Sequence, residues 1–312
     1  MQDNIQQNAW ERDVIEKALT AAVTEQRRAR RWGIFFKLSF LALFFLVIFA
    51  SCSDQVTHKP LVAHTAVINI DGMIDTEFNS AKLINEGLRT AFEDNQAQGI
   101  ILKLNSPGGS PVQSNEVFAE IKRLRELYPN KKVYAVIEDV CASGCYYIAV
   151  GADDIYANPA SLVGSIGVLF DGFGFVDTLN KLGVQRRLLT AGQNKGFMDP
   201  FSPTTPEMNS FVQSMLDDIH QQFITAVEQG RGDRLHKNDV IFSGLAWTGN
   251  QSKELGLIDG FGSADYVARE IIGAKTLIDY TATPNWFERL SQHMGASIAY
   301  AMRNEMYKQQ MM

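Results

Sequence analysis

Short apolar runs alternate with amphipathic segments through the middle of the chain. Residues 65–70, 99–104 and 133–137 are runs of strand length rich in Val, Ile and Leu. The segments between them, 80–92 and 112–128, have the spacing of amphipathic helices. Strands that alternate with helices in this way are typical of a parallel sheet. The pattern therefore predicts an α/β fold with parallel strands.

The alternation continues with shorter elements towards the C-terminus. Three further strands are predicted, at 154–157, 167–170 and 185–190. Four further helices are predicted, at 173–182, 206–229, 247–255 and 263–272. Residues 284–312 carry an apolar stripe at helical spacing. This tail is expected to be a helix that packs on the domain or on a neighbouring subunit.

One segment near the N-terminus is uniformly apolar. Residues 33–50 read GIFFKLSFLALFFLVIFA, in which Lys37 is the only charge. This length approaches the roughly 20 residues that cross a bilayer. Four arginines directly precede it, namely Arg27, Arg28, Arg30 and Arg31. The positive-inside rule then predicts a single-pass anchor, with the N-terminus in the cytoplasm and the later residues outside it.

Other readings of this segment stay open. A cleaved signal peptide usually has a shorter polar start than residues 1–32. A buried core helix would be amphipathic, whereas this run is apolar on all sides. Cys52, just after the run, raises the further alternative of lipoprotein processing.

Composition narrows the classes of function. The 312 residues include 46% hydrophobic and 21% charged residues with a formal net charge of −6, so the chain lacks the basic surface of a nucleic-acid-binding protein. Three cysteines do not make a disulfide scaffold, and the five scattered histidines have no metal-ligand spacing. The sequence therefore predicts neither a metal site nor a cofactor.

Three glycine-bearing segments follow predicted strands, at the edge where α/β folds bind their ligands. They are 105–109 (NSPGG), 141–145 (CASGC) and 164–167 (GSIG). Glycines let backbone N–H groups approach a ligand closely. A serine at the start of a helix, as expected for Ser143, lies beside unpaired N–H groups that stabilise an oxyanion. An ordinary turn or an N-cap serine would give each of these patterns alone.

A lysine follows in the segment 192–198 (GQNKGFM). Lys195 has small and apolar neighbours, and it would serve as a general base if burial lowered its pKa by about 3 units, a cost of about 4 kcal/mol. An exposed surface lysine is the alternative. No histidine occurs between His64 and His220, so the motif region lacks the imidazole of a Ser-His-Asp triad.

Five motifs in order resemble those of the signal peptide peptidase SppA family of Ser–Lys proteases: NSPGG (105–109), ASGCYY (142–147), GSIGV (164–168), NKGFMDP (194–200) and GRG (230–232). The resemblance covers residues 66–259. It implies a crotonase-like fold of repeated β-β-α units in a superhelix, preceded by one transmembrane helix. It also implies an endopeptidase of the bacterial inner membrane that degrades remnant signal peptides and other peptides outside the cytoplasm.

The resemblance further implies roles for particular residues. Ser143 is similar to the family's nucleophile, Lys195 to its general base and Ser165 to the serine that orients the lysine amine. Gly109 and Gly144 resemble the glycines of the oxyanion hole.

Two cysteines flank the expected nucleophile. Cys145 departs from the family, which commonly has glycine at this position. A disulfide between Cys141 and Cys145 would be strained across so tight a turn, so both are expected to be small buried packing residues.

The short form of the family implies an assembly. In the long members the nucleophile and the lysine come from different halves of the chain. A chain with one half would take Lys195 from a neighbour, which predicts a homo-oligomeric ring with shared active sites. The predicted segments are then a cytoplasmic part (1–32), the anchor (33–50), a linker (51–64), the peptidase domain (65–283) and the tail (284–312).

Two other functions fit parts of the pattern. An acyl-CoA enzyme of the same fold would use the glycine loops to polarise a thioester, but acyl-CoA is not expected outside the cytoplasm. An inactive membrane scaffold would have no need of Ser143, Ser165 and Lys195 together. The letters Arg231-Gly232-Asp233 resemble an adhesion motif, for which a surface turn is the simpler interpretation.

Overall fold

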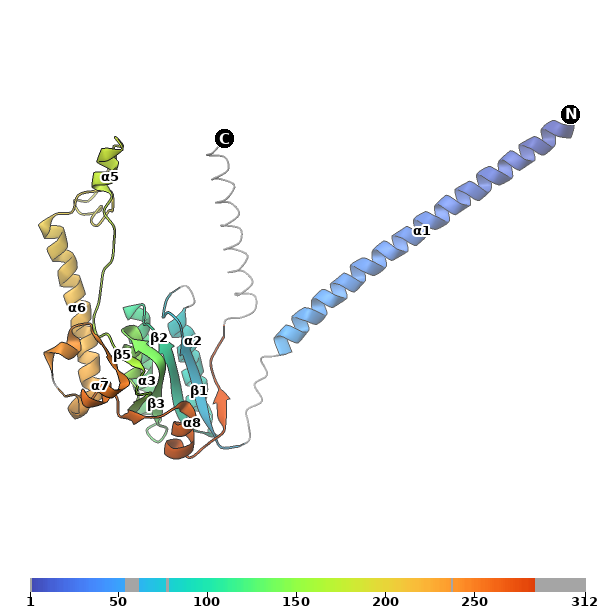
Figure 1. Cartoon of the computed structure of the whole chain (residues 1–312). Helices are drawn as coiled ribbons and strands as arrows, with labels where there is room; N and C mark the ends of the chain where they lie inside the picture. Colours follow the sequence, from blue (N-terminus) through green and yellow to red (C-terminus); the bar gives the residue numbers. More distant parts are fainter. Residues whose placement is uncertain (1, 54–61, 77–78, 237, 284–312) are drawn as a thin grey trace. The chain divides into compact units, whose positions relative to one another are not determined.

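The computed structural model describes residues 2–53, 62–76, 79–236 and 238–283 (Figure 1). It divides into two compact units, Met1–Lys59 and Pro60–Met312. The predicted tail, 284–312, lies outside the described residues, as does most of the predicted linker.

The first unit contains one helix, α1 (Gln2–Ser53). It includes both the predicted cytoplasmic segment and the predicted anchor, of which residues 47–50 have no described side chains. Its first 30 residues are rich in Ala, Gln, Glu and Arg, which favour a continuous helix. Within the described part of the chain, no helix is long and apolar enough to cross a membrane.

The second unit is built on one sheet with the order β6-β5-β3-β2-β1-β8. Its central strands are β1 (His64–Asp71), β2 (Ala97–Ser106) and β3 (Val133–Ala142), all parallel. The shorter strands are β4 (Asp154–Ala157), β5 (Leu162–Gly164), β6 (Ala246–Thr248), β7 (Gly260–Phe261) and β8 (Leu277–Asp279). Only the pairing of β5 with β6 is antiparallel among the described strands. The predicted parallel α/β sheet is confirmed.

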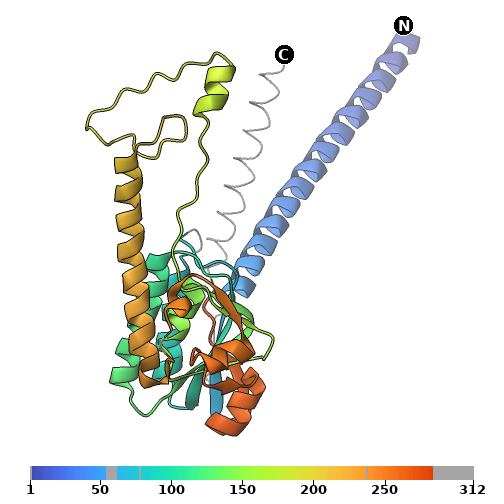
Figure 2. The same ribbon diagram turned by 60° about the vertical axis from the view of Figure 1, so that its left-hand side comes forward.

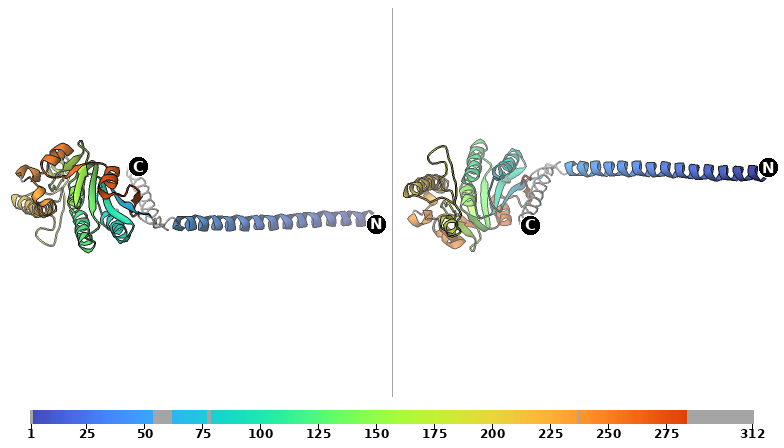
Figure 3. Two further views of the ribbon diagram at one scale, coloured as in Figure 1. Left: turned by 90° about the horizontal axis from the view of Figure 1, so that it is seen from below. Right: turned by 90° about the horizontal axis from the view of Figure 1, so that it is seen from above.

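Helices cover both faces of the sheet (Figure 3). On one face lie α2 (Ser80–Glu93), α3 (Pro111–Leu127) and α4 (Gly144–Ala149), which pack on residues such as Ile68 and Leu102. On the other face, α8 (Ala264–Tyr266) and the π-helix η3 (Val267–Ile272) cover the alternate residues, including Ile101. Both faces are buried because successive side chains of a strand point to opposite sides.

β3 changes partner along its length, and this change positions the site. Residues 134–137 pair with β4, whereas residues 140–142 pair with β5. The register against β2 shifts between these halves. Such an irregularity bends a strand. The second half of β3 therefore leads directly to Ser143, at the start of α4.

Most predicted elements are confirmed, but of those between β5 and α6 (Pro206–Arg231) only the helix predicted at 173–182 is confirmed, and only in part. Residues 167–205, here called the arm, contain one short helix, α5 (Val176–Lys181). The predictions of strands at 167–170 and 185–190 were wrong. Figures 1 and 2 show the arm standing away from the sheet, so its backbone has no neighbouring strand to pair with.

Two predicted helices near the C-terminus were wrong in part. Residues 246–248 pair with β5 as strand β6 before α7 (Gly249–Glu254) begins. The predicted helix 263–272 is divided between α8 and η3. The 3-10 turns η1 (Gly232–Arg234) and η2 (Asp239–Phe242) complete the described elements.

Candidate active site

Ser143 occupies the turn between β3 and α4 in an unusual backbone conformation. Its φ is 52° and its ψ is −124°, which few residues other than glycine adopt. Its N–H donates to the carbonyl oxygen of Gly164 at 2.8 Å, and its own carbonyl accepts from Tyr147 N at 3.0 Å. Ser143 is the N-cap residue of α4, but its hydroxyl makes no capping bond to the helix, so the alternative of an ordinary capping serine is not supported. The half-buried hydroxyl is thus not engaged by the helix that follows it.

Gly108 and Gly109 lie against this turn because β2 ends beside β3. Their φ values are 103° and 150°, in the region that favours glycine. A Cβ atom on Gly108 would lie 2.8 Å from the Cβ atom of Ser143. A Cβ atom on Gly109 would collide with the carbonyl of Ile74, with which Gly109 forms a β-bridge. Only glycines permit this close approach of two backbones.

The backbone nitrogens of Gly109 and Gly144 lie close together beside the turn of Ser143. A Cβ atom on Gly144 would lie 3.3 Å from the nitrogen of Gly109 and would collide with the hydroxyl of Ser114. Gly144 is the first residue of α4, so its N–H has no acceptor within the helix. Two N–H groups next to a serine hydroxyl can stabilise the oxyanion of an acyl-transfer reaction.

Ser165 lies in the adjoining turn, also with a positive φ of 50°. Its N–H donates to the carbonyl of Leu245 at 2.9 Å. The next carbonyl, that of Ile166, is 3.1 Å from Nε2 of His220 on α6. No pattern in the sequence indicates this contact, because His220 is one polar residue among many on a long helix. Three separate parts of the chain therefore hold the turn that carries Ser165: Leu245, His220 of α6, and Ser143, whose N–H donates to the carbonyl of Gly164.

Lys195 is not brought to these residues within one chain. It lies in the arm, where its side chain is exposed and its N–H donates to the carbonyl of Gly192 at 3.1 Å. No hydrogen bond among the described residues joins its amine to Ser143 or Ser165. The fold thus assembles Ser143, Ser165, Gly109 and Gly144 and leaves the fifth predicted residue apart.

The two cysteines beside Ser143 form a disulfide, so the prediction of unpaired packing residues was wrong. Cys141 is near the end of β3 and Cys145 is in the first turn of α4. The chain reverses between them, which brings their Cα atoms to 5.1 Å, within the range that a disulfide requires. Both residues are fully buried, as predicted.

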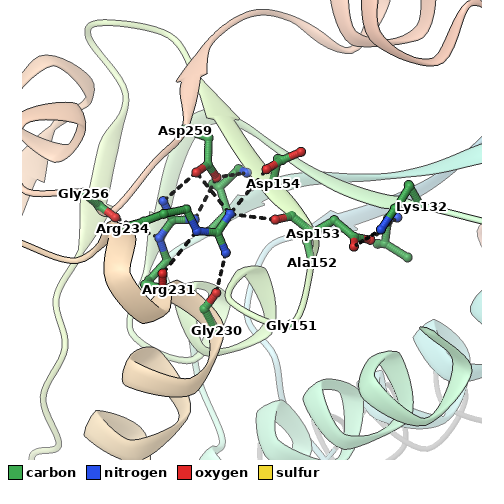
Figure 4. Close-up of polar contacts among 12 residues, drawn as sticks. Lys132, Gly151, Ala152, Asp153, Asp154, Gly230, Arg231, Arg234, Gly256 and Asp259 are labelled. Atoms are coloured by element: carbon green, nitrogen blue, oxygen red, sulfur yellow. Dashed lines mark hydrogen bonds and ion pairs between the residues drawn. The ribbon is translucent and has the colours of Figure 1, made fainter. Parts of the chain in front are cut away.

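A buried ion pair between Arg231 and Asp259 lies near α4 (Figure 4). The side chain of Arg231, 1% exposed, binds both carboxylate oxygens of Asp259 at 2.7 and 2.9 Å and donates to the carbonyl of Gly256 at 2.8 Å. Burial acts to raise the pKa of Asp259, but the hydrogen bonds and charge of Arg231, the N–H of Ile155 and the charge of Arg234 together outweigh it and hold that pKa below its usual value. The adjacent carbonyl of Leu257 accepts a bond from the Tyr146 hydroxyl of α4 at 2.7 Å. The adhesion reading is excluded because Arg231 is buried.

Comparisons with known proteins identify the family. The model of peptidase family S49 matches residues 125–277. A "Putative protease" of Synechocystis sp. is 32% identical over 200 residues, which cover 64% of this chain and 70% of that protein. A "Putative signal peptide peptidase SppA" of Enterococcus faecium is 30% identical over 205 residues, 66% of this chain and 59% of that protein.

One longer relative is named as a transporter and not as a protease. The Na(+)/H(+) antiporter NhaA of Brucella abortus is 44% identical over 188 residues, or 60% of this chain. The chain spans only 25% of the length of that protein. The relatives from Synechocystis and Enterococcus, together with the matched family model, show that the chain belongs to peptidase family S49, the family of the SppA signal peptide peptidases.

Proposed function

We propose that the protein is a serine endopeptidase with Ser143 as its nucleophile and Lys195 as its general base. The observation that carries this proposal is the position of Ser143, in a turn of positive φ that packs against Gly108 and is followed by Gly144, whose backbone lies close to the nitrogen of Gly109. Ser165, whose turn is hydrogen-bonded to that of Ser143, orients the lysine amine.

The mechanism follows from these positions. The neutral amine of Lys195 accepts the proton of Ser143 as the hydroxyl oxygen attacks the peptide carbonyl. The N–H groups of Gly109 and Gly144 stabilise the oxyanion that forms. The lysine ammonium then protonates the leaving amine, and water hydrolyses the acyl-enzyme with Lys195 again acting as base. No cofactor is needed for any of these steps.

Lys195 reaches the active site of a neighbouring copy in this proposal. The arm that carries it exposes many large apolar side chains, among them Leu169 (81%), Phe173 (76%) and Leu189 (96%). So many apolar side chains on one segment are typical of an interface and uncommon on a free surface. We propose that the arm packs on the next subunit, and that repetition of this contact closes a ring in which active sites are shared.

The proposed location is the outer side of the bacterial inner membrane. Residues 33–50, with one charge, and the arginines before them support an anchor whose N-terminus is cytoplasmic. The proposed substrates are remnant signal peptides and other peptides, by analogy with the name of the Enterococcus relative. Extraction of membranes with alkaline carbonate should leave the protein in the pellet; release into the supernatant would contradict the anchor.

The finer fold assignment is also a proposal. We propose that the sheet and its helices follow the crotonase-like superhelix. The parallel β1-β2-β3 core, and the partner change of β3 that delivers Ser143 to the start of α4, support it. Superposition of an experimental structure on a crotonase would test it, and a different strand order would contradict it.

A fluorophosphonate probe tests the peptidase activity, because it reacts only with an activated serine. The wild-type protein should be labelled at Ser143 and should cleave a peptide, whereas Ser143→Ala should do neither. Lys195→Ala should lose nearly all of both activities, because nucleophile and base act as a unit. A wild-type protein that is not labelled would favour an inactive scaffold. Full peptidase activity in Lys195→Ala would exclude the proposed base.

A further inference from the structure

The Cys141–Cys145 disulfide encloses the proposed nucleophile. Cys141 is fixed in the sheet, where it pairs with Ser106 of β2 and Val163 of β5. Cys145 is fixed in α4, which packs in the main core. Ser143 is the central residue of the five-residue ring that the disulfide closes. Neither cysteine has a place in the mechanism proposed above.

Ser143 needs such a constraint because its backbone conformation is sparsely populated. A serine at φ 52° and ψ −124° persists only where its surroundings over-determine it. Two backbone hydrogen bonds hold it, to Gly164 and from Tyr147. The disulfide adds a covalent link between the residue two positions before it and the residue two positions after it. It therefore limits how far the turn can relax towards an ordinary conformation.

We propose that the Cys141–Cys145 disulfide is a positioning element for the nucleophile, so that Ser143 reaches its full reactivity only when the pair is oxidised. This inference rests on the peptidase function proposed above. The two N–H groups of the oxyanion hole come from different segments, and Gly144 lies inside the disulfide ring. Relaxation of the ring would move both the hydroxyl of Ser143 and the N–H of Gly144.

The oxidation is an ordinary thiol–disulfide exchange with a disulfide donor such as oxidised glutathione. The Cys145 thiolate attacks a donor sulfur and expels one glutathione thiol. The Cys141 thiolate then attacks the Cys145 sulfur of the mixed disulfide and expels the second. Two protons and two electrons pass from the cysteines to the donor. Because both side chains are buried, the exchange belongs to folding in an oxidising compartment, before the turn closes.

The test compares full-length wild-type protein with the double variant Cys141→Ala/Cys145→Ala. The matched control is Cys52→Ala, which removes the third cysteine and leaves the disulfide. The double variant should show a kcat about ten- to a hundredfold lower, as a small displacement of a reacting group does. Its KM should stay within about twofold, because substrate contacts are unchanged. Fluorophosphonate labelling of Ser143 should slow in parallel, at a temperature well below the melting point of each variant.

A second measurement decides the matter if the double variant does not fold. Wild-type protein is refolded in reductant or in oxidised glutathione, and free thiols are counted by alkylation and mass spectrometry. Activity should rise in step with the loss of two thiols. Full activity with both thiols free, or wild-type rates in the folded double variant, would overturn the proposal. An unlabelled, inactive oxidised wild-type protein would instead contradict the peptidase function itself.

Discussion

Glu120 shows how single charged residues stabilise the helical face of this sheet. Its side chain, 9% exposed, lies on α3 and accepts hydrogen bonds from Arg123 at 2.8 and 2.9 Å and from Arg89 of α2 at 2.6 Å. The bond from Arg123 lowers the pKa of Glu120 most; burial opposes it, and Arg89 adds to it, for a pKa of about 2. The carboxylate therefore joins α2 to α3 only while it is ionised.

We expect this group to make stability depend on acid. The pKa of Glu120 is lower in the folded state than its ordinary value of 4.5, so its contribution is fully present above about pH 4.5 and is lost as the pH falls towards 2. Urea denaturation of wild type and Glu120→Gln at several pH values between 6 and 3 would measure this. The gap in stability between the two proteins should narrow as the pH falls. A constant gap would show that Glu120 does not titrate in this range.

At the scale of elements, the contact between α6 and α4 places the helix that follows Ser143. Gly230, near the end of α6, approaches the carbonyl of Val150, just after α4, so closely that a Cβ atom would collide with it. Arg231 comes next and forms the buried ion pair with Asp259. The GRG motif (230–232) thus provides both the close contact of Gly230 with Val150 and the ion pair of Arg231 with Asp259.

Gly230→Ala should therefore destabilise the domain by about 1–3 kcal/mol, although alanine favours a helix more than glycine does. The collision is with backbone, which cannot move aside as a flexible side chain does. Gly174→Ala is the matched control, because no atom lies within 4 Å of its added Cβ. Thermal melting followed by circular dichroism would compare them. Equal melting temperatures would mean that α4 and α6 separate without cost.

The long elements were predictable from sequence, as was the four-residue strand β4, but the shortest strands were not. β1, β2 and β3 have continuous apolar runs because both of their faces are buried, and α2 and α3 have clear helical periods. β6, β7 and β8 contain two or three residues each, and they are strands only because a neighbour pairs with them. Tertiary context decides such segments.

Residues of the candidate site that belong to short sequence motifs could be predicted. Ser143, Ser165, Gly109 and Gly144 were found by resemblance, and the fold brings them together. The disulfide and the contact from His220 depend on distances between segments, which no local pattern contains. The sequence argument against the disulfide failed because it considered the turn without the reversal from β3 into α4.

At the scale of the whole molecule, the arm bears on the proposal that each active site is shared between two chains. It carries Lys195 and exposes apolar residues over much of its length, including Phe170 and Leu182. No described hydrogen bond joins Lys195 to Ser143, so a catalytic role in its own chain would require the arm to rearrange. A catalytic role of Lys195 in a neighbouring chain would require only that two copies of the chain bind each other.

Complementation between inactive variants distinguishes these cases. Ser143→Ala supplies an intact arm, and Lys195→Ala supplies an intact nucleophile. When the two variants are mixed under conditions of proven subunit exchange, part of the wild-type peptidase activity should return. Some active sites would then contain Ser143 from one chain and Lys195 from the other. A mixture that stays inactive would place Ser143 and Lys195 of each site in one chain.

The position of β1 has a mechanical consequence. β1 begins at His64, near the start of the second unit, and is hydrogen-bonded on both sides, to β2 over its whole length and to β8 at Thr65–Val67. A tension applied through the preceding residues acts along the strand and shears both ladders at once. Hydrogen bonds sheared together resist force better than bonds that open one after another. We therefore expect β1 to stay paired in the sheet when a pulling force acts on the N-terminal end of this domain.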